Sequence, residues 1–185
     1  MSGVLVAYSS VDGHTRRICE RIATLIERQG LQVRVAPLAD CGLHDIVACD
    51  MLVIGAAIRY GHHQRHVATF VEQHRPAIEA LPNAFFSVNV VARKPGKDTP
   101  QGNPYLRRFL HQVEWQPRML AVFAGRIDYP RLGRLDRMVI RFIMWLTGGP
   151  TDPTRAFEFT DWARVDAFAL EIAALAQQAR RSAVV

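Results

Sequence analysis

The sequence has few cysteines and no long uninterrupted apolar run. Cys19, Cys41 and Cys49 are odd in number and form no Cys-x-x-Cys pair, which argues against a disulfide framework and a zinc site. No run of about 18 apolar residues is present, so no segment is expected to cross a bilayer. A basic leader and a cleavage-site pattern are also missing. We therefore expect a protein of the reducing cytoplasm.

Acidic residues are also in the minority. The chain has 23 Lys and Arg against 17 Asp and Glu, a net charge of +6. Residues 90–118 contain six basic and two acidic side chains, and residues 126–141 contain five basic and two acidic ones. This clustering implies a basic region that faces anionic lipid, nucleic acid or an acidic substrate. No nucleic-acid-binding motif is present and the second segment is rich in apolar residues, so no nucleic acid is expected as a partner.

The 185 residues, 49% of them hydrophobic, suit a single domain over residues 1–185. Apolar runs that predict strands alternate with segments of helical periodicity. The first expected strand begins at Val4. The other four cover Leu31–Leu38, Met51–Ala57, Ala84–Val90 and Met119–Gly125. The expected helices cover Thr15–Gln29, Gln64–Ala80 and 161–180. This alternation predicts an α/β fold with a doubly wound parallel sheet and right-handed crossovers.

The first strand ends in small and hydroxylated residues, and a helix follows at once. The connecting stretch is Ser9, Ser10, Val11, Asp12, Gly13, His14 and Thr15. A tight turn at Gly13 aims several backbone N–H groups and hydroxyls at one anion, above the positive end of the helix dipole. The stretch is neither a Walker A loop nor a dinucleotide fingerprint, which favours a terminal phosphomonoester. The alternative is a capped turn that binds nothing.

Two more loops should converge on the same edge of the sheet, Ile58–His63 and Ser87–Lys97. Tyr60 offers a ring for a planar heterocycle, Gly61 allows close approach, and Asn89 and backbone amides of the third loop could hydrogen-bond the edge of the heterocycle. FMN satisfies all three loops. The alternatives are that Tyr60 only packs and that Arg93-Lys94-Pro95 is a solvated turn. His62, His63 and His66 have no suitably spaced carboxylate, so no metal is expected.

About thirty residues separate the strand ending at Gly125 from a short strand expected at Phe157–Thr160, and this gap is too long for an ordinary connection. We expect a helical insert, about residues 126–150, in the last strand. Within it Arg134, Arg137 and Arg141 lie on one stripe of an otherwise apolar helix, with Trp145 near its end. Such a helix suits an anionic membrane surface, contacted through residues 126–147. The alternative is a helix packed on the domain or in a dimer interface.

The motifs together resemble a known family. The stretch from Ser10 to Thr15 resembles the phosphate loop of flavodoxins. Five further stretches are similar, in register, to the flavodoxin-like, quinone-dependent protoporphyrinogen IX dehydrogenases. They are 54–62 (IGAAIRYGH), 86–95 (FSVNVVARKP), 129–131 (YPR), 148–152 (GGPTD) and 160–162 (TDW).

The resemblance implies a five-stranded parallel sheet of order 2-1-3-4-5 and an FMN enzyme. Such an enzyme takes hydrogen from protoporphyrinogen IX in three two-electron steps, giving protoporphyrin IX, and passes the electrons to a membrane quinone, menaquinone or ubiquinone. We assign no protein acid or base, and flavin N5 is the expected hydride acceptor. The cofactor-binding residues expected from the resemblance are Ser9, Ser10, Val11, Asp12, Gly13, His14, Thr15, Arg59, Tyr60, Gly61, Ser87, Val88, Asn89, Val90, Val91 and Ala92.

Protoporphyrinogen has two propionates, and the charge distribution suggests Arg93, Arg126 or Arg131 as their contacts. We expect the protein to be attached peripherally to the cytoplasmic face of the inner membrane. The sequence leaves open whether it forms a homo-oligomer. Two rivals share the fold, a soluble electron-carrier flavodoxin and an NAD(P)H:quinone oxidoreductase.

Overall fold

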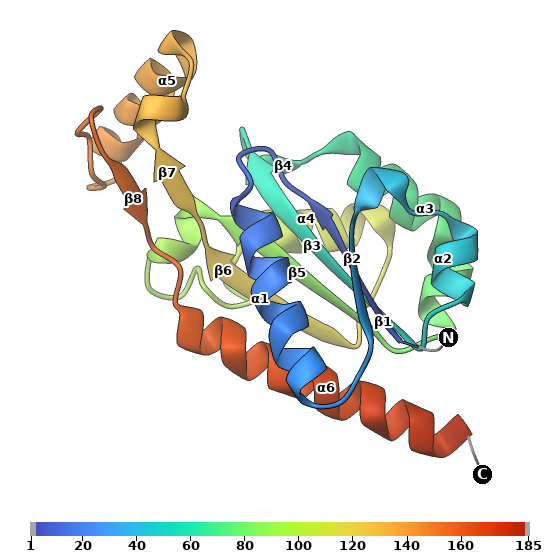
Figure 1. Ribbon diagram of the computed structural model, residues 1–185. Helices are drawn as coiled ribbons and strands as arrows, with labels where there is room; N and C mark the ends of the chain where they lie inside the picture. The colour runs from blue at the N-terminus through green and yellow to red at the C-terminus, as the bar shows by residue number, and fades with distance from the viewer. Residues whose placement is uncertain (1–2, 184–185) are drawn as a thin grey trace.

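The structure is a computed structural model that describes residues 3–183. Its centre is a sheet of five parallel strands (Figure 1). From edge to edge they are β2 (Val33–Pro37), β1 (Val4–Ser9), β3 (Met51–Arg59), β5 (Asn83–Asn89) and β6 (Met119–Ala124). Counted along these five strands the order is 2-1-3-4-5, which confirms the predicted flavodoxin-like sheet. A short strand, β4 (His62–His63), pairs antiparallel with the end of β3.

The central strands are buried on both faces, as their continuous apolar runs require. The first six residues of β3 and all of β5 are buried. Gly55 in β3 lies against the ring of Phe86 in β5, and a Cβ at position 55 would be 2.2 Å from Phe86 Cζ. The glycine therefore lets the two strands pair around a large aromatic side chain. The parallel register brings the ends of β1, β3, β5 and β6 to one edge of the sheet.

Helices cover both faces of the sheet (Figure 1). On one face α1 (His14–Arg28) and α6 (Trp162–Ala183) share a core with the strands. On the other face lie α2 (Leu43–Val47), α3 (Arg65–Glu79) and α4 (Pro104–Val113), with the 3₁₀ turn Leu38–Asp40. Helices α1, α3 and α6 were predicted to within a few residues at each end, whereas α2 and α4 were not located from the sequence.

After β6 the chain leaves the sheet. It forms β7 (Arg126–Asp128), a 3₁₀ turn (Tyr129–Arg131), α5 (Arg134–Leu146) and β8 (Ala156–Glu158). Strands β7 and β8 pair antiparallel in a separate ribbon, so the strand expected at Phe157–Thr160 is shorter and does not join the main sheet. We call residues 126–158 the insert. In Figure 1 its ribbon and α5 extend away from the end of the sheet.

The insert has a small core of its own. Ile127, Tyr129 and Met144 are buried against each other. The Tyr129 hydroxyl donates to the carbonyl of Pro150 at 2.7 Å, and the guanidinium of Arg137 donates to three carbonyls between residues 129 and 132. These contacts fix the base of α5.

Within residues 3–183 no helix is both long enough and apolar enough to span a membrane.

Candidate functional site

The loop from Ser9 to Thr15 joins β1 to α1 and leaves the N-terminus of α1 open. Gly13 is the N-cap residue, has φ +79°, and provides no side-chain cap, and the first turn contains no acidic residue. The Ser10 hydroxyl and His14 Nδ1 are buried and have no hydrogen-bond partner among residues 3–183. Uncapped backbone N–H groups and two unpartnered buried polar atoms in one turn fit an anionic group such as the FMN phosphate.

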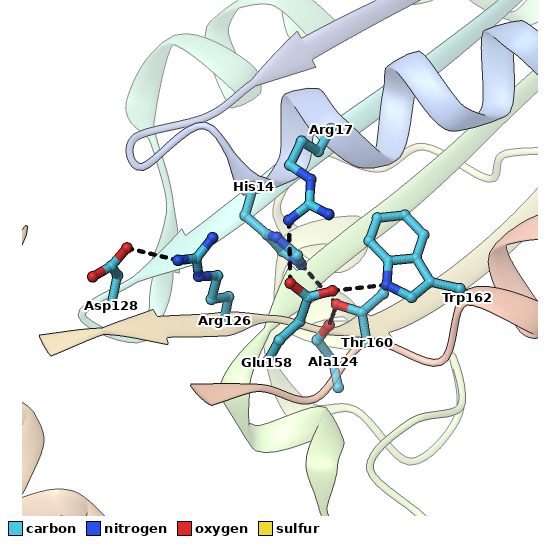
Figure 2. A network of polar contacts seen from close by, with 8 residues as sticks. All are labelled: His14, Arg17, Ala124, Arg126, Asp128, Glu158, Thr160 and Trp162. Carbon is cyan, nitrogen blue, oxygen red and sulfur yellow. Dashed lines mark hydrogen bonds and ion pairs between the residues drawn. The ribbon is translucent and has the colours of Figure 1, made fainter. Parts of the chain in front are cut away.

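Figure 2 shows the hydrogen bonds that connect His14 to Thr160 and Ala124, beside a second set of polar contacts made by Glu158 of the insert. The Nε2 of His14 lies 2.7 Å from the Thr160 hydroxyl, which donates to the carbonyl of Ala124 at 2.7 Å. Because a hydroxyl has a single proton, Thr160 accepts from His14 Nε2–H. The neutral imidazole therefore has its lone pair at Nδ1, the atom without a partner. Next to a phosphate, only a protonated Nδ1 can donate a hydrogen bond.

The groups around His14 shift its pKa in opposite directions. Burial lowers its pKa below 6.5, Glu158 acts to raise it, and Arg17 and Arg126 lower it further. Glu158 also accepts hydrogen bonds from Arg17 at 3.1 Å and from the Trp162 indole at 2.7 Å (Figure 2). Without an anion at Nδ1, His14 is therefore neutral at pH 7.

We expect FMN affinity to contain a proton-linked contribution from His14. A phosphate at Nδ1 raises the His14 pKa in the complex, so a proton is taken up on binding and affinity falls as pH rises through neutrality. A shift of one pKa unit corresponds to about tenfold in affinity. Flavin fluorescence titrations between pH 6 and 8 should show this fall in the native protein and not in His14→Gln. The second ionisation of the phosphate is common to both proteins, so equal pH profiles would contradict the assignment.

The second loop is a two-residue hairpin between β3 and β4. Arg59 pairs with His62, and the turn residues Tyr60 and Gly61 have φ +51° and +81°. Two successive residues at positive φ are typical of a type I′ turn. The side chain of Tyr60 is 61% exposed, so its ring does not pack in the core. The hairpin is expected to flank the flavin, and its exposed ring is compatible with that role.

Asp136 of α5 joins the insert to this hairpin. Its carboxylate accepts hydrogen bonds from the Tyr60 hydroxyl and, at 2.6 Å, from Arg59 Nη2. Arg59 Nη1 also lies 3.5 Å from Asp12 of the phosphate loop. The hydrogen bonds from Tyr60 and Arg59 lower the pKa of Asp136, and the bond from Tyr60 has the larger effect. No local sequence pattern predicts this contact, although Asp136 is the only acidic residue of α5.

Replacing Asp136 by Asn should loosen α5 from the hairpin. The neutral amide loses both charge-assisted contacts, and we expect the amides of residues 134–146 to exchange several times faster with deuterium. Hydrogen-exchange mass spectrometry would measure this rate. Asp152→Asn is the matched control, because the hydrogen bonds of Asp152 are to Thr154 in its own turn. Equal exchange in native protein and Asp136→Asn would show that the contact does not hold the helix.

The third loop is shaped by buried polar residues. The side-chain oxygen of Asn89 accepts from Ala92 N at 3.0 Å and from Asn103 Nδ2 at 3.2 Å, and its Nδ2 donates to the Ser87 hydroxyl. Asn89 is only 4% exposed. Its amide therefore holds the 3₁₀ turn Val90–Arg93 instead of facing a ligand, which corrects the expectation from the sequence. Ser87, Val88 and Ala92 are also buried, so a ligand can reach this loop mainly through Val90, Val91 and the backbone.

The three candidate substrate arginines differ in their surroundings. Arg93 donates to the carbonyl and hydroxyl of Thr147 and to the carbonyl of Val90, which ties α5 to the third loop. Arg126 forms an ion pair with Asp128 at 2.9 Å, and Arg131 lies 3.8 Å from the same carboxylate. Arg126 and Arg131 line a cavity of about 100 Å³ beside Gly13 and His14. Their contact with substrate stays a prediction.

Within residues 3–183 no cluster of His, Cys, Asp or Glu is arranged for a metal ion.

Known proteins can be aligned with this chain over nearly its whole length. A flavodoxin domain family model matches residues 5–154. A protein from Escherichia coli (strain K12) named protoporphyrinogen IX dehydrogenase (quinone) is 43% identical over 171 residues, which is 92% of this chain and 94% of that protein. A protein of the same name from Leishmania major is 42% identical over 92% of this chain and 74% of its own length.

Solved flavodoxins show the same fold at low identity. A flavodoxin mutant from Pseudomonas aeruginosa superimposes with a TM-score of 0.56 at 13% identity, over 96% of this chain and 99% of the other. A flavodoxin from the domain Archaea gives a TM-score of 0.54 at 15% identity over the same shares. At this level of identity the likeness concerns the fold alone.

Proposed function

Because the chain belongs to the flavodoxin-domain family of quinone-dependent protoporphyrinogen IX dehydrogenases, we propose that it oxidises protoporphyrinogen IX to protoporphyrin IX with FMN as cofactor. A membrane quinone, menaquinone or ubiquinone, is the electron acceptor. The observation that supports this most is the 42–43% identity over 92% of the chain, which extends well beyond the phosphate loop. The open N-terminus of α1 with its unpartnered Ser10 hydroxyl and His14 Nδ1 supports FMN independently.

The residues of the site bind and orient, and none is assigned as acid or base. Backbone N–H groups of residues 11–15 and the Ser10 hydroxyl would hold the phosphate, with His14 as a further donor. Tyr60 and Gly61 would flank the ring, and Val90 and Val91 would line it. When bound, FMN supplies a ring that accepts and releases electron pairs, which no side chain here can do.

We also propose that α5 attaches the protein peripherally to the cytoplasmic face of the inner membrane. Most of its large apolar side chains are exposed instead of packed. They are Leu135 (77%), Met138 (70%), Val139 (47%), Phe142 (58%), Ile143 (45%), Trp145 (69%) and Leu146 (62%). Arg134 and Arg141 are exposed on the same helix. An apolar face next to arginines suits an anionic lipid surface, and it would bring the flavin site to a quinone dissolved in lipid.

Two anaerobic experiments test the activity. The purified protein should bind FMN and turn yellow. The loaded protein should then form protoporphyrin IX from protoporphyrinogen IX only when a menaquinone or ubiquinone analogue is added. Reduction of the flavin by NADPH without porphyrinogen oxidation would favour an NAD(P)H:quinone oxidoreductase. A yellow protein inactive in both assays would favour an electron carrier, and a protein that stays colourless with added FMN would exclude all three.

A further inference from the structure

The β3–β4 hairpin also borders a cavity on the side of α3 and α4. The cavity has a volume of about 180 Å³ and lies between the hairpin, the start of α3 and the face of α4. Gly61 and His62 form one wall, and Arg65, Tyr105, Arg108 and Gln112 are among the other lining residues. No acidic residue lines it.

We propose that this cavity binds a carboxylate of the tetrapyrrole substrate through Arg65 and Arg108. The inference rests on the proposed function, because it assumes a substrate with two propionates. It assigns the carboxylate contact to residues other than Arg93, Arg126 and Arg131.

The charges support this assignment. Within residues 3–183 neither Arg65 nor Arg108 forms an ion pair or a side-chain hydrogen bond. By contrast, Arg59 is paired with Asp136 and Asp12, and Arg126 with Asp128. Two guanidinium groups around a cavity without a carboxylate leave a positive charge that an anionic ligand neutralises.

The position of the cavity also supports it. Tyr60 and Gly61 form the tip of the hairpin that is expected to flank the flavin, and Gly61 and His62 continue into the wall of the cavity. Gly61 lies next to Tyr105 of α4, because a Cβ at position 61 would be 3.5 Å from the Tyr105 ring, an ordinary contact distance. The hairpin is thus shared by the expected flavin site and the cavity, so a substrate that reaches the flavin beside this hairpin lies next to the cavity.

The back wall is fixed and uncharged. His63 Nε2 lies 3.1 Å from the Ser87 hydroxyl, and the His63 ring packs against Phe109 at a centroid distance of 4.6 Å. Burial lowers the pKa of His63 to about 3, so it stays neutral at pH 7. The two arginines stay protonated near neutrality and give the cavity a positive charge.

The test compares Arg108→Gln with Arg107→Gln in the FMN-loaded protein. Both residues are exposed on α4 and unpaired, but only Arg108 lines the cavity. Fluorescence titration measures binding of protoporphyrin IX and of its uncharged dimethyl ester. Arg108→Gln and Arg65→Gln should each weaken binding of the free acid by about three- to tenfold and leave the diester unchanged. Arg107→Gln should bind both as the native protein does, and Arg108→Lys should recover part of the loss.

Three outcomes would overturn the inference. They are equal effects of the Arg107 and Arg108 variants, equal loss for acid and diester, or loss of anionic-vesicle binding without loss of porphyrin binding, which would identify a lipid headgroup as the anion. Failure of the proposed function looks different. In that case the native protein itself binds no FMN, or does not oxidise protoporphyrinogen with a quinone.

Discussion

Replacing Phe142 and Trp145 together by Glu is expected to weaken binding to anionic vesicles by at least about a hundredfold. Both rings are more than half exposed, and their centroids lie 6.1 Å apart on α5. Burying a large apolar side chain contributes about 1.5–3 kcal/mol, so losing two costs more than about 3 kcal/mol. A factor of ten in affinity corresponds to about 1.4 kcal/mol. Vesicle flotation or sedimentation with phosphatidylglycerol measures the change.

The control uses apolar side chains exposed elsewhere. Leu43 and Val47 on α2 are 52% and 67% exposed, and replacing both by Glu adds the same charge. These replacements should leave vesicle binding within about twofold, because α2 and α5 lie at opposite sides of the molecule (Figure 1). Phe142→Gln with Trp145→Gln separates the loss of apolar surface from the added negative charge. Similar losses for the α2 and α5 variants would mean that net charge alone governs binding.

The same variants distinguish a membrane from a second copy of the chain. If α5 packs in a dimer, the native protein sediments as a dimer without lipid, and the α5 variants sediment as monomers with unchanged lipid binding. If α5 contacts lipid, vesicle binding falls and the sedimentation coefficient does not change. Binding should also weaken with salt, because exposed charges such as Arg134 and Arg141 are screened over about 8 Å at 0.15 M.

Local patterns were sufficient for most of the fold. The apolar run Met51–Ala57 predicted a strand buried on both faces, because only a central parallel strand needs no polar alternation. A helix inside the insert was predicted because Arg134, Arg137 and Arg141 recur at helical spacing, and α5 (Arg134–Leu146) contains all three. Helix α4 was missed, although Asn103 followed by Pro104 is a recognisable start and the Asn103 side chain caps the helix.

Contacts between distant segments could not be predicted. His14 meets Thr160 across 146 positions, and Asp136 meets Tyr60 across 76, so neither pair leaves a periodic pattern. Asn89 was expected to hydrogen-bond the edge of the heterocycle because its loop, Ser87–Lys97, lies at the carboxyl ends of the strands, where ligands bind in such sheets. Its amide is instead engaged by Asn103, fourteen residues later, in a loop whose path no local rule predicts. The sequence therefore located the loops of the site but not which atoms in them are free.

Replacing Ser10 by Asp is expected to abolish FMN binding almost completely while leaving riboflavin binding within about threefold. The Ser10 hydroxyl is buried and unpartnered, so a carboxylate at this position lies against the phosphate. Two like charges about 4 Å apart repel by about 4 kcal/mol at an effective dielectric of about 20. That corresponds to an affinity loss of at least about a hundredfold. Flavin fluorescence quenching, with FMN and riboflavin titrated in parallel, measures both affinities.

Neutral replacements separate charge from shape. Ser10→Asn has nearly the shape of Ser10→Asp without its charge, and Ser10→Ala removes a hydrogen bond worth about 1.5–3 kcal/mol to a charged acceptor, or about tenfold or more in affinity. The expected order of FMN affinity is native, then Ala and Asn, then Asp. A parallel loss of riboflavin binding in Ser10→Asp would place the damage at the ring or in the fold instead of at the phosphate.

Thermal unfolding gives a second measure of the same contact. A ligand at a hundred times its dissociation constant stabilises the native state by about 2.7 kcal/mol, and that stabilisation falls to about 0.4 kcal/mol when affinity drops a hundredfold. FMN at such a concentration should therefore raise the melting temperature of the native protein clearly and that of Ser10→Asp barely. An equal shift in both proteins would show that the cofactor is bound by its ring alone.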